Sequence, residues 1–113
     1  KNKKTPVILT EPTIYNGKRI TGKIMLASIH EAERFFELKM LLRAGRIFNL
    51  RLQEPYTLID KSAYGVKIKY VADFVYEENG KTIVEDAKGV RTDVYRLKKR
   101  LLAERYGIII RET

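Results

Sequence analysis

The dipeptide Asn79-Gly80 constrains the fold of this chain more than any other feature of its sequence. It separates two runs in which apolar and polar residues alternate, residues 66–77 and residues 81–88. Asn-Gly between such runs is the strongest short-range signal for a β-hairpin with a two-residue turn. We therefore predict two antiparallel strands, with Glu78 paired with Lys81 and Val75 opposite Val84.

This register places two acidic residues opposite each other, Asp73 on the first strand and Asp86 on the second. Directly opposed side chains have Cβ atoms roughly 5 Å apart, and two carboxylates at that distance repel by about 3 kcal/mol at an effective dielectric constant of about 20. A divalent cation between them turns repulsion into coordination, and oxygen ligands suit Mg²⁺ or Mn²⁺. Lys88 shares the face of Asp86. An alternative stays open, in which this face is solvated and Lys88 neutralises one acid.

Two helices and two more strands are predicted around the hairpin. Apolar residues at helical spacing predict the helices, and Gly45 and Gly107 follow them as C-terminal stops. Residues 54–65 are rich in turn-forming residues and receive no assignment. Residues 1–23 are read as a basic N-terminal arm with at most one short strand. The predicted elements are, in order, a helix (28–44), a strand (47–53), the two hairpin strands, a helix (92–106) and a strand (108–111).

The order of these elements, helix, three strands, helix, strand, limits the topology. The first three strands can form an antiparallel meander, and the fourth can join the sheet after a helical crossover. The length of 113 residues fits one domain. We therefore expect a single domain of the α/β (α+β) class, with a mixed sheet flanked by helices.

Glu31 lies on the core-facing stripe of the first predicted helix, together with Phe35, Leu38 and Leu42. A carboxylate on an apolar stripe needs a partner. Ser28 and Glu31 also match a capping box, in which the glutamate turns back to the amide that precedes the helix. Both interpretations stay open, because the first turn of a helix can also hold a metal ligand.

The charge of the chain points to a polyanionic partner. Lys and Arg number 23 against 14 acidic residues, which gives a net charge of +9. A basic domain of this size is typical of proteins that neutralise nucleic-acid phosphates. Lys98 interrupts the apolar stripe of the second helix, either as a lysine whose stem packs on that stripe or as a cation directed at a phosphate. The candidate DNA-binding residues are Lys18, Arg19, Arg91, Arg96, Lys98 and Lys99.

The composition also excludes some classes of protein. With no cysteine and a single histidine, His30, the chain has neither a disulfide framework nor the ligands of a zinc site. No apolar run approaches the roughly 18 residues of a membrane span, and the N-terminus lacks the apolar stretch of a signal peptide. We therefore expect a cytoplasmic protein.

The spacing of the acidic residues resembles the PD-(D/E)xK nuclease superfamily, with a helix glutamate, an aspartate, and then Asp86-Ala87-Lys88. The likeness is closest to small phage proteins with the pattern ADFVYxxxGxxxVEDxKGxxTxVYxLKxK, for which this chain reads ADFVYEENGKTIVEDAKGVRTDVYRLKKR from Ala72 to Arg100. Ser28-x-x-Glu31 and the series Gly45, Ile47, Leu50, Gln53 also look like that group. The resemblance covers most of residues 28–111.

This resemblance implies a restriction-endonuclease-like αβββαβ core over residues 28–111. It also implies Glu31, Asp73 and Asp86 as ligands of Mg²⁺ or Mn²⁺, with Lys88 as the catalytic lysine. Gln53 and Ser28 are candidate accessory residues, and Glu85 points to the opposite face. Ala27 and Ile29 stand where a charged pair is expected, which leaves the local substrate contacts open.

Small phage members of the superfamily resemble Holliday-junction resolvases, which cut four-way DNA junctions as homodimers. The resemblance therefore implies a phage-encoded crossover junction endodeoxyribonuclease in a bacterial host. Two alternatives remain: another endonuclease of this fold, of the restriction, nicking or transposon-end type, and a non-catalytic nucleic-acid-binding domain. Buried acids facing phosphate argue against the second alternative.

Overall fold

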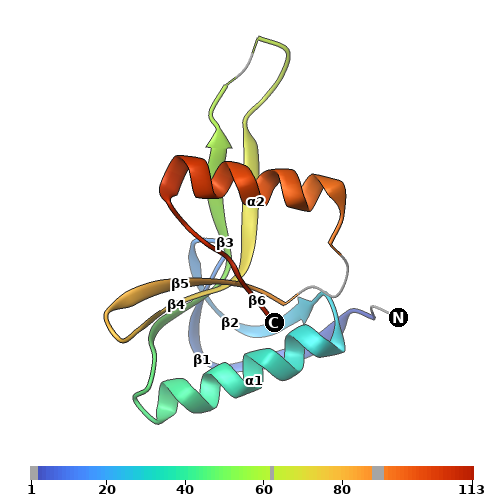
Figure 1. Ribbon diagram of the computed structural model, residues 1–113. Coiled ribbons are helices and arrows are strands. Elements are labelled where there is room, and N and C mark those ends of the chain that lie inside the picture. The colour runs from blue at the N-terminus through green and yellow to red at the C-terminus, as the bar shows by residue number, and fades with distance from the viewer. Residues whose placement is uncertain (1–2, 62, 88–90) are drawn as a thin grey trace.

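The computed structural model describes residues 3–61, 63–87 and 91–113, and these form a mixed sheet of six strands with two helices (Figure 1). The strand order is β2-β1-β3-β4-β5-β6. This confirms the prediction of an α+β domain with a mixed sheet. The elements are β1 (Thr5–Tyr15), β2 (Lys18–Leu26), α1 (Ile29–Arg43), β3 (Phe48–Ile59), β4 (Ile68–Glu78), β5 (Lys81–Asp86), α2 (Asp93–Tyr106) and β6 (Arg111–Glu112).

The hairpin between β4 and β5 has the predicted register. Glu78 pairs with Lys81 and Val75 with Val84, and both turn residues have the positive φ that the tight turn requires, 53° at Asn79 and 77° at Gly80. The backbone ladder ends at Phe74 and Glu85, one position before Asp73 and Asp86, which the same register places opposite each other. The Asp73 carboxylate instead accepts a hydrogen bond of 2.8 Å from the backbone N–H of Ala87. The Asp73 side chain therefore links β4 to the residue that follows β5, at the point where the backbone ladder stops.

The N-terminal segment differs from the prediction of a basic arm. β1 and β2 form an antiparallel hairpin, and the last two residues of β1, Ile14 and Tyr15, pair in parallel with β3. The turn is Asn16-Gly17, with φ of 52° and 78°, the same dipeptide solution as in the β4–β5 hairpin. The register of the β1–β2 ladder shifts between Leu9 and Thr13, around Pro12, where a proline without an N–H is tolerated.

The third and last strands also differ from their predicted lengths. β3 runs on to Ile59 through the segment that received no assignment, because residues 54–59 pair with β4. Gln53, within β3, has a left-handed φ of 52°, which interrupts the regular strand geometry there. β6 contains only Arg111 and Glu112, which pair in parallel with Glu85 and Asp86. The antiparallel meander and the parallel strand after a helical crossover are therefore confirmed, with other boundaries.

The two helices lie on opposite sides of the β4–β5 part of the sheet (Figure 1). Phe35 and Leu38 of α1 pack into one apolar cluster with Leu52 and Phe74, and the rings of Phe35 and Phe74 are stacked with centroids 6.3 Å apart. The other cluster contains Tyr95 and Leu102 of α2, packed with residues that include Val75, Val84 and Tyr70. The sheet between α1 and α2 therefore has no solvated face around β5, and polar groups placed there are buried.

Both helices begin and end as the sequence predicts. Ser28 caps α1 by accepting a hydrogen bond of 3.1 Å from the N–H of Glu31, and Thr92 caps α2 in the same way. Gly45 has a φ of 73° just after α1, and Gly107 ends α2 in the left-handed conformation. No helix among the described residues is long and apolar enough to cross a membrane.

Candidate active site

Asp73 and Asp86 are buried next to each other at the point where β4 and β5 separate. Their exposed fractions are 3% and 1%. The 2.8 Å hydrogen bond from the Ala87 N–H fixes one oxygen of Asp73 against the residue that follows Asp86. Two carboxylates from adjacent strands are thus held in one buried place.

Tyr70 orients the second of these carboxylates. Its hydroxyl, which belongs to a side chain only 4% exposed, donates a hydrogen bond of 2.8 Å to Oδ2 of Asp86. Burial raises the pKa of Tyr70, and the negative charges of Asp86 and Asp73 raise it further. The phenol is therefore a proton donor throughout the physiological range, and it keeps Asp86 in one orientation.

Glu31 reaches the same region from α1. Its side chain is 3% exposed, and Nε2 of Gln53 donates a hydrogen bond of 3.2 Å to its Oε2. The β3–β4 ladder pairs the two neighbours of Gln53 with Ala72 and Phe74, which places Gln53 beside Asp73. The hydrogen bond from Gln53 to Glu31 therefore connects α1 to β3, at the position of β3 that lies beside Asp73 of β4. One hydrogen bond of the predicted capping box is present, from the N–H of Glu31 to the hydroxyl of Ser28. The side chain of Glu31, however, accepts its hydrogen bond from Gln53.

Asp73, Asp86 and Glu31 thus come from three elements, and each accepts a hydrogen bond from a fixed donor. Each also takes part in a further interaction beyond those named above. Among residues 3–61, 63–87 and 91–113, no group of three or more histidine, cysteine, aspartate or glutamate side chains is arranged to hold a metal ion. Mg²⁺ is commonly bound by one or two carboxylates together with substrate phosphates, so oxygen donors from two aspartates fit this ion. Lys88, the predicted catalytic lysine, lies outside the described residues.

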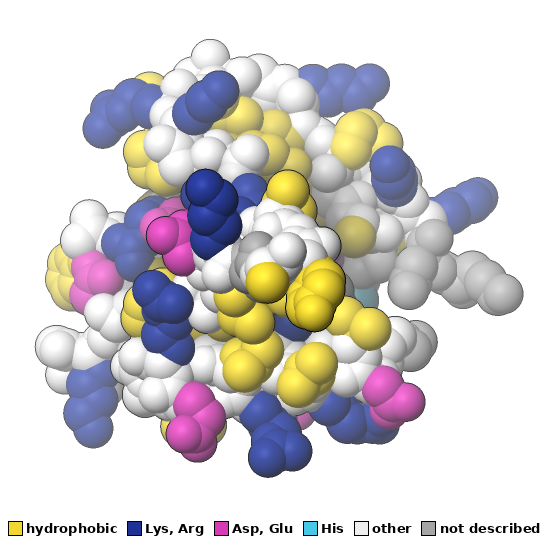
Figure 2. Space-filling view, turned by 90° about the horizontal axis from the view of Figure 1, so that it is seen from above, with side chains coloured by type: hydrophobic (Ala, Val, Ile, Leu, Met, Phe, Trp, Pro, Cys, Tyr) yellow, Lys and Arg dark blue, Asp and Glu magenta, His cyan; other side chains and the backbone are white. Residues whose placement is uncertain are grey.

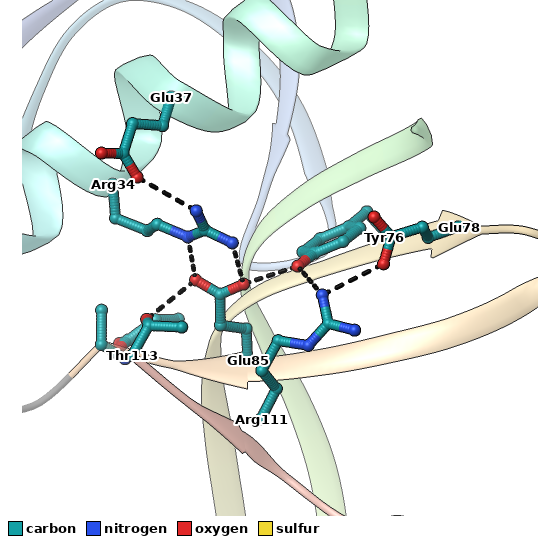
Figure 3. A network of polar contacts seen from close by, with 9 residues as sticks. Arg34, Glu37, Tyr76, Glu78, Glu85, Arg111 and Thr113 are labelled. Carbon is teal, nitrogen blue, oxygen red and sulfur yellow. Dashed lines mark hydrogen bonds and ion pairs between the residues drawn. The ribbon is translucent and has the colours of Figure 1, made fainter. Parts of the chain in front are cut away.

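Glu85, the neighbour of Asp86, belongs to a different network on the α1 side of the sheet (Figure 3). It is fully buried, and Nε and Nη2 of Arg34 donate two hydrogen bonds, of 2.6 and 3.0 Å, to its two oxygens. Tyr76 and Thr113 donate further bonds of 2.6 and 3.0 Å. Burial alone raises the pKa of Glu85, but the hydrogen bonds from Arg34 and Tyr76 outweigh it and the pKa is lowered. Glu85 is therefore a charged structural anchor, as expected from its opposite face.

The Glu85 network joins α1, β4, β5 and the C-terminus. Nη1 of Arg111 donates to the Tyr76 hydroxyl and to Glu78, both at 3.1 Å, which extends the network along β4 (Figure 3). The network thereby fixes β5 on one side while Asp86 occupies the other. The sequence carried no local signal for Arg34, because its partner is 51 residues away.

The predicted DNA-binding residues are distributed over several surfaces. Arg91 and Lys99 form ion pairs with Glu112 of β6, at 3.0 and 3.1 Å. A hydrogen bond from Tyr95 is the main cause that lowers the pKa of Glu112, to about 2. These two cations therefore help to attach α2 to the end of the sheet.

The other predicted cations lie elsewhere. Arg96 pairs with the exposed Asp93 at 2.9 Å, and Lys18 is exposed at the start of β2. Arg19 lines a pocket of about 400 Å³ between β1, β3 and α1, which contains none of the three candidate acids. Lys98 lines a pocket of about 240 Å³ between α2 and β4. Tyr70 lines this second pocket as well, so Lys98 shares a pocket with the residue that binds Asp86.

Tyr70 is the residue of this site that sequence reasoning missed. It belongs to β4 and lies three residues before Asp73, but nothing in the local pattern shows that its hydroxyl turns toward β5. Tyrosine in a strand more often packs as a large apolar side chain. A signal was present only in the combination of a strand tyrosine with a buried acid on the neighbouring strand.

Comparison with known proteins gives one match. A family model described as "Protein of unknown function (DUF1064)" matches residues 13–111, a range that includes every candidate acid and Gln53. No curated protein and no solved structure matches the chain.

Proposed function

Since this chain belongs to the family described as "Protein of unknown function (DUF1064)", we propose a function from its own site: a divalent-cation-dependent endonuclease that hydrolyses phosphodiester bonds in DNA. The observation that carries this proposal is the pair of buried carboxylates, Asp73 and Asp86, on adjacent strands. Burying two negative charges side by side is costly, and a fold keeps such a pair where a cation or a reaction uses it.

The donor chemistry of the site fits Mg²⁺ or Mn²⁺. Carboxylate oxygens are ligands of both ions, and carboxylates that bind metals are typically held by hydrogen bonds from surrounding groups. Tyr70 and the Ala87 N–H hold Asp86 and Asp73 in this way, and Gln53 holds Glu31. A bound divalent cation would polarise the phosphodiester and stabilise the charge that develops during hydrolysis.

The residues of the chain have distinct roles in the proposed reaction. Asp73 and Asp86 would hold the cation, and Glu31, which Gln53 binds, would supply a further carboxylate from α1. Lys88 has the role of the catalytic lysine that the resemblance to PD-(D/E)xK nucleases implies, which is to stabilise negative charge on the phosphate in the transition state. The restriction-endonuclease-like core belongs to the same proposal.

The substrate is proposed from charge and from the resemblance. A net charge of +9 suits DNA as the polyanion. The resemblance to small phage resolvases makes branched DNA, above all a four-way junction, the preferred substrate, and a homodimer the acting species. The protein then works in a bacterial host cell infected by the phage.

A cleavage assay tests the proposal. The protein is incubated with a four-way junction and with a linear duplex of equal length, in Mg²⁺ and in excess EDTA. We expect paired nicks in the junction in Mg²⁺ and no cleavage in EDTA. Full cleavage in EDTA would overturn the metal mechanism. Equal cutting of the duplex at one sequence would favour a restriction-type enzyme.

A second assay separates catalysis from binding. Lys88→Ala should lower turnover far more than DNA affinity, because its proposed role lies in the transition state. Lys81→Ala, at the exposed β4–β5 turn, is the matched control and should leave turnover unchanged. Tight DNA binding by the parent with no cleavage under any metal condition would leave a non-catalytic DNA-binding domain.

A further inference from the structure

β3 and β4 extend beyond the rest of the sheet as a two-stranded arm. The β3–β4 ladder continues to Ile59 and Ile68, whereas β5 pairs with β4 only from Phe74 onward. α2 packs across this arm through Tyr95 and Leu102, and the arm projects past the helix (Figure 1). Beyond α2, the described residues of the arm have no packing partner in the domain.

The tip of the arm is both apolar and basic. Tyr64 is 100% exposed and Val66 is 84% exposed, so neither side chain stabilises the fold by burial. Lys61, Lys67 and Lys69 are exposed around them, and Asp60 is the one acidic residue among the described residues 59–61 and 63–69. Viewed from above, with the end of the arm toward the viewer, the molecule exposes many lysine and arginine side chains, with hydrophobic groups between them and few acids (Figure 2). Cations around an exposed aromatic ring are typical of protein surfaces that bind nucleic acid.

The base of the arm leads directly to the candidate active site. Lys67 and Lys69 are exposed residues of the extended segment that leads to Asp73. Lys69 also lines the pocket of about 240 Å³ between β4 and α2, opposite Lys98. Tyr70 lines that pocket and holds Asp86. Exposed lysines therefore lie between the tip of the arm and the pocket that Tyr70 lines.

We infer that this arm is a DNA-binding element, in which Lys67, Lys69 and Lys98 contact phosphates and Tyr64 stacks on the base face that unstacking exposes at a branch point. The inference rests on the proposed function and names how the substrate is held. At roughly 3.3 Å per residue, the six steps along the chain from Lys67 to Asp73 span about 20 Å. That length is about six base steps of duplex DNA. Tyr64 therefore contacts DNA well away from the phosphate that is cut.

Binding measurements in EDTA, where no cleavage interferes, test the arm. Tyr64→Ala should weaken binding to a four-way junction about five- to tenfold, because base–aromatic stacking contributes on the order of 1 kcal/mol. Binding to a linear duplex, whose internal base stack is uninterrupted, should change less than about twofold. Phe48→Ala removes another exposed aromatic side chain, 57% exposed, at the opposite end of β3 and should have no effect on either DNA.

The lysines are tested by salt dependence. Each phosphate contact adds about 0.9 to the slope of log affinity against log salt concentration, so the double variant Lys67→Ala, Lys69→Ala should lower that slope by about 2 on both DNAs. Lys81→Ala is the control. The melting temperature of each variant should equal that of the parent, since all these side chains are exposed.

The outcomes separate the arm from the proposed function. If the parent binds and cuts junctions while the arm variants bind as tightly as the parent, the arm inference fails and the nuclease stands. If the parent neither binds nor cuts DNA, the proposed function fails. Equal losses on both DNAs for Tyr64→Ala would overturn stacking at the branch point. Loss of dimer formation without loss of DNA affinity would assign the tip to a subunit contact and overturn the inference.

Discussion

The hydroxyl of Tyr70 donates a 2.8 Å hydrogen bond to Asp86, and both side chains are almost completely buried. This contact joins β4 to β5 beyond the end of their backbone ladder, which stops at Phe74 and Glu85. It makes the orientation of one candidate metal ligand depend on a neutral donor that cannot ionise in the physiological range. Five predictions test this contact and the groups around it.

Tyr70→Phe removes one hydroxyl and little volume. Residues that hold metal ligands typically contribute 10- to 100-fold to metal affinity or activity, so we expect a loss of that size in cleavage rate at limiting Mg²⁺. Tyr106→Phe is the matched control, because its hydroxyl donates to the carbonyl of Thr57 at an exposed position. Activity equal to the parent for Tyr70→Phe, over a titration of Mg²⁺, would show that Asp86 needs no such support.

Asp86→Asn keeps the shape of the side chain and an oxygen that can accept from Tyr70. We expect it to abolish cleavage and to leave DNA binding in EDTA intact, because the proposed affinity comes from basic residues. In thermal melts, Mg²⁺ should raise the melting temperature of the parent and not that of the variant, since the ion stabilises the native state that it binds. Asp93→Asn, whose side chain is fully exposed, should behave as the parent in both measurements.

Gln53→Asn tests a residue in a strained conformation. Asparagine tolerates a φ of 52° better than glutamine, so the variant should be as stable as the parent or more so. The shorter amide cannot reach Oε2 of Glu31 as Gln53 does at 3.2 Å. We therefore expect reduced cleavage at full stability, measured by junction assays and urea unfolding. Loss of stability together with activity would make Gln53 a purely structural residue.

Glu85→Gln tests the network on the other face of β5. Breaking a buried ion pair by removing one partner costs about 3 kcal/mol, so the free energy of unfolding should fall by about that amount. Glu37→Gln is the control, because Glu37 pairs with the same arginine at 3.0 Å but is 59% exposed, and it should cost less than about 1 kcal/mol. A small effect of Glu85→Gln would show that the arginine finds another partner.

The same variant predicts a pH dependence. The pKa of Glu85 is lower in the folded protein than its unfolded value of about 4.3. Its contribution to stability is therefore complete above about pH 4.3 and is lost as the pH falls through the folded value. The stability difference between the parent and Glu85→Gln, from urea unfolding between neutral and acid pH, should shrink in that range. A difference that stays constant would show that the carboxylate of Glu85 does not cause it.

Local sequence determined the turns and the helix ends of this protein. Asn79-Gly80 fixed the β4–β5 register because a two-residue turn with two positive φ values allows one pairing only. Ser28 and Gly107 marked helix ends because capping uses hydrogen bonds within four residues. Asn16-Gly17 carried the same signal as Asn79-Gly80, and the nearby Pro12 obscured it because proline is rare inside strands.

The burial of Glu31, Asp73 and Asp86 in one region was decided by tertiary structure. The sequence placed Glu31 on a buried stripe and the two aspartates on neighbouring strands. It did not show that Gln53 binds Glu31 or that Tyr70 binds Asp86, because these contacts form only when the elements pack together. The same holds for Arg34 and Glu85, which are 51 residues apart. Turn and cap geometry depends on atoms a few residues apart, and is written in the local sequence. Contacts between side chains far apart in the sequence depend on how whole elements bury their apolar faces. They can therefore be identified only in the folded structure.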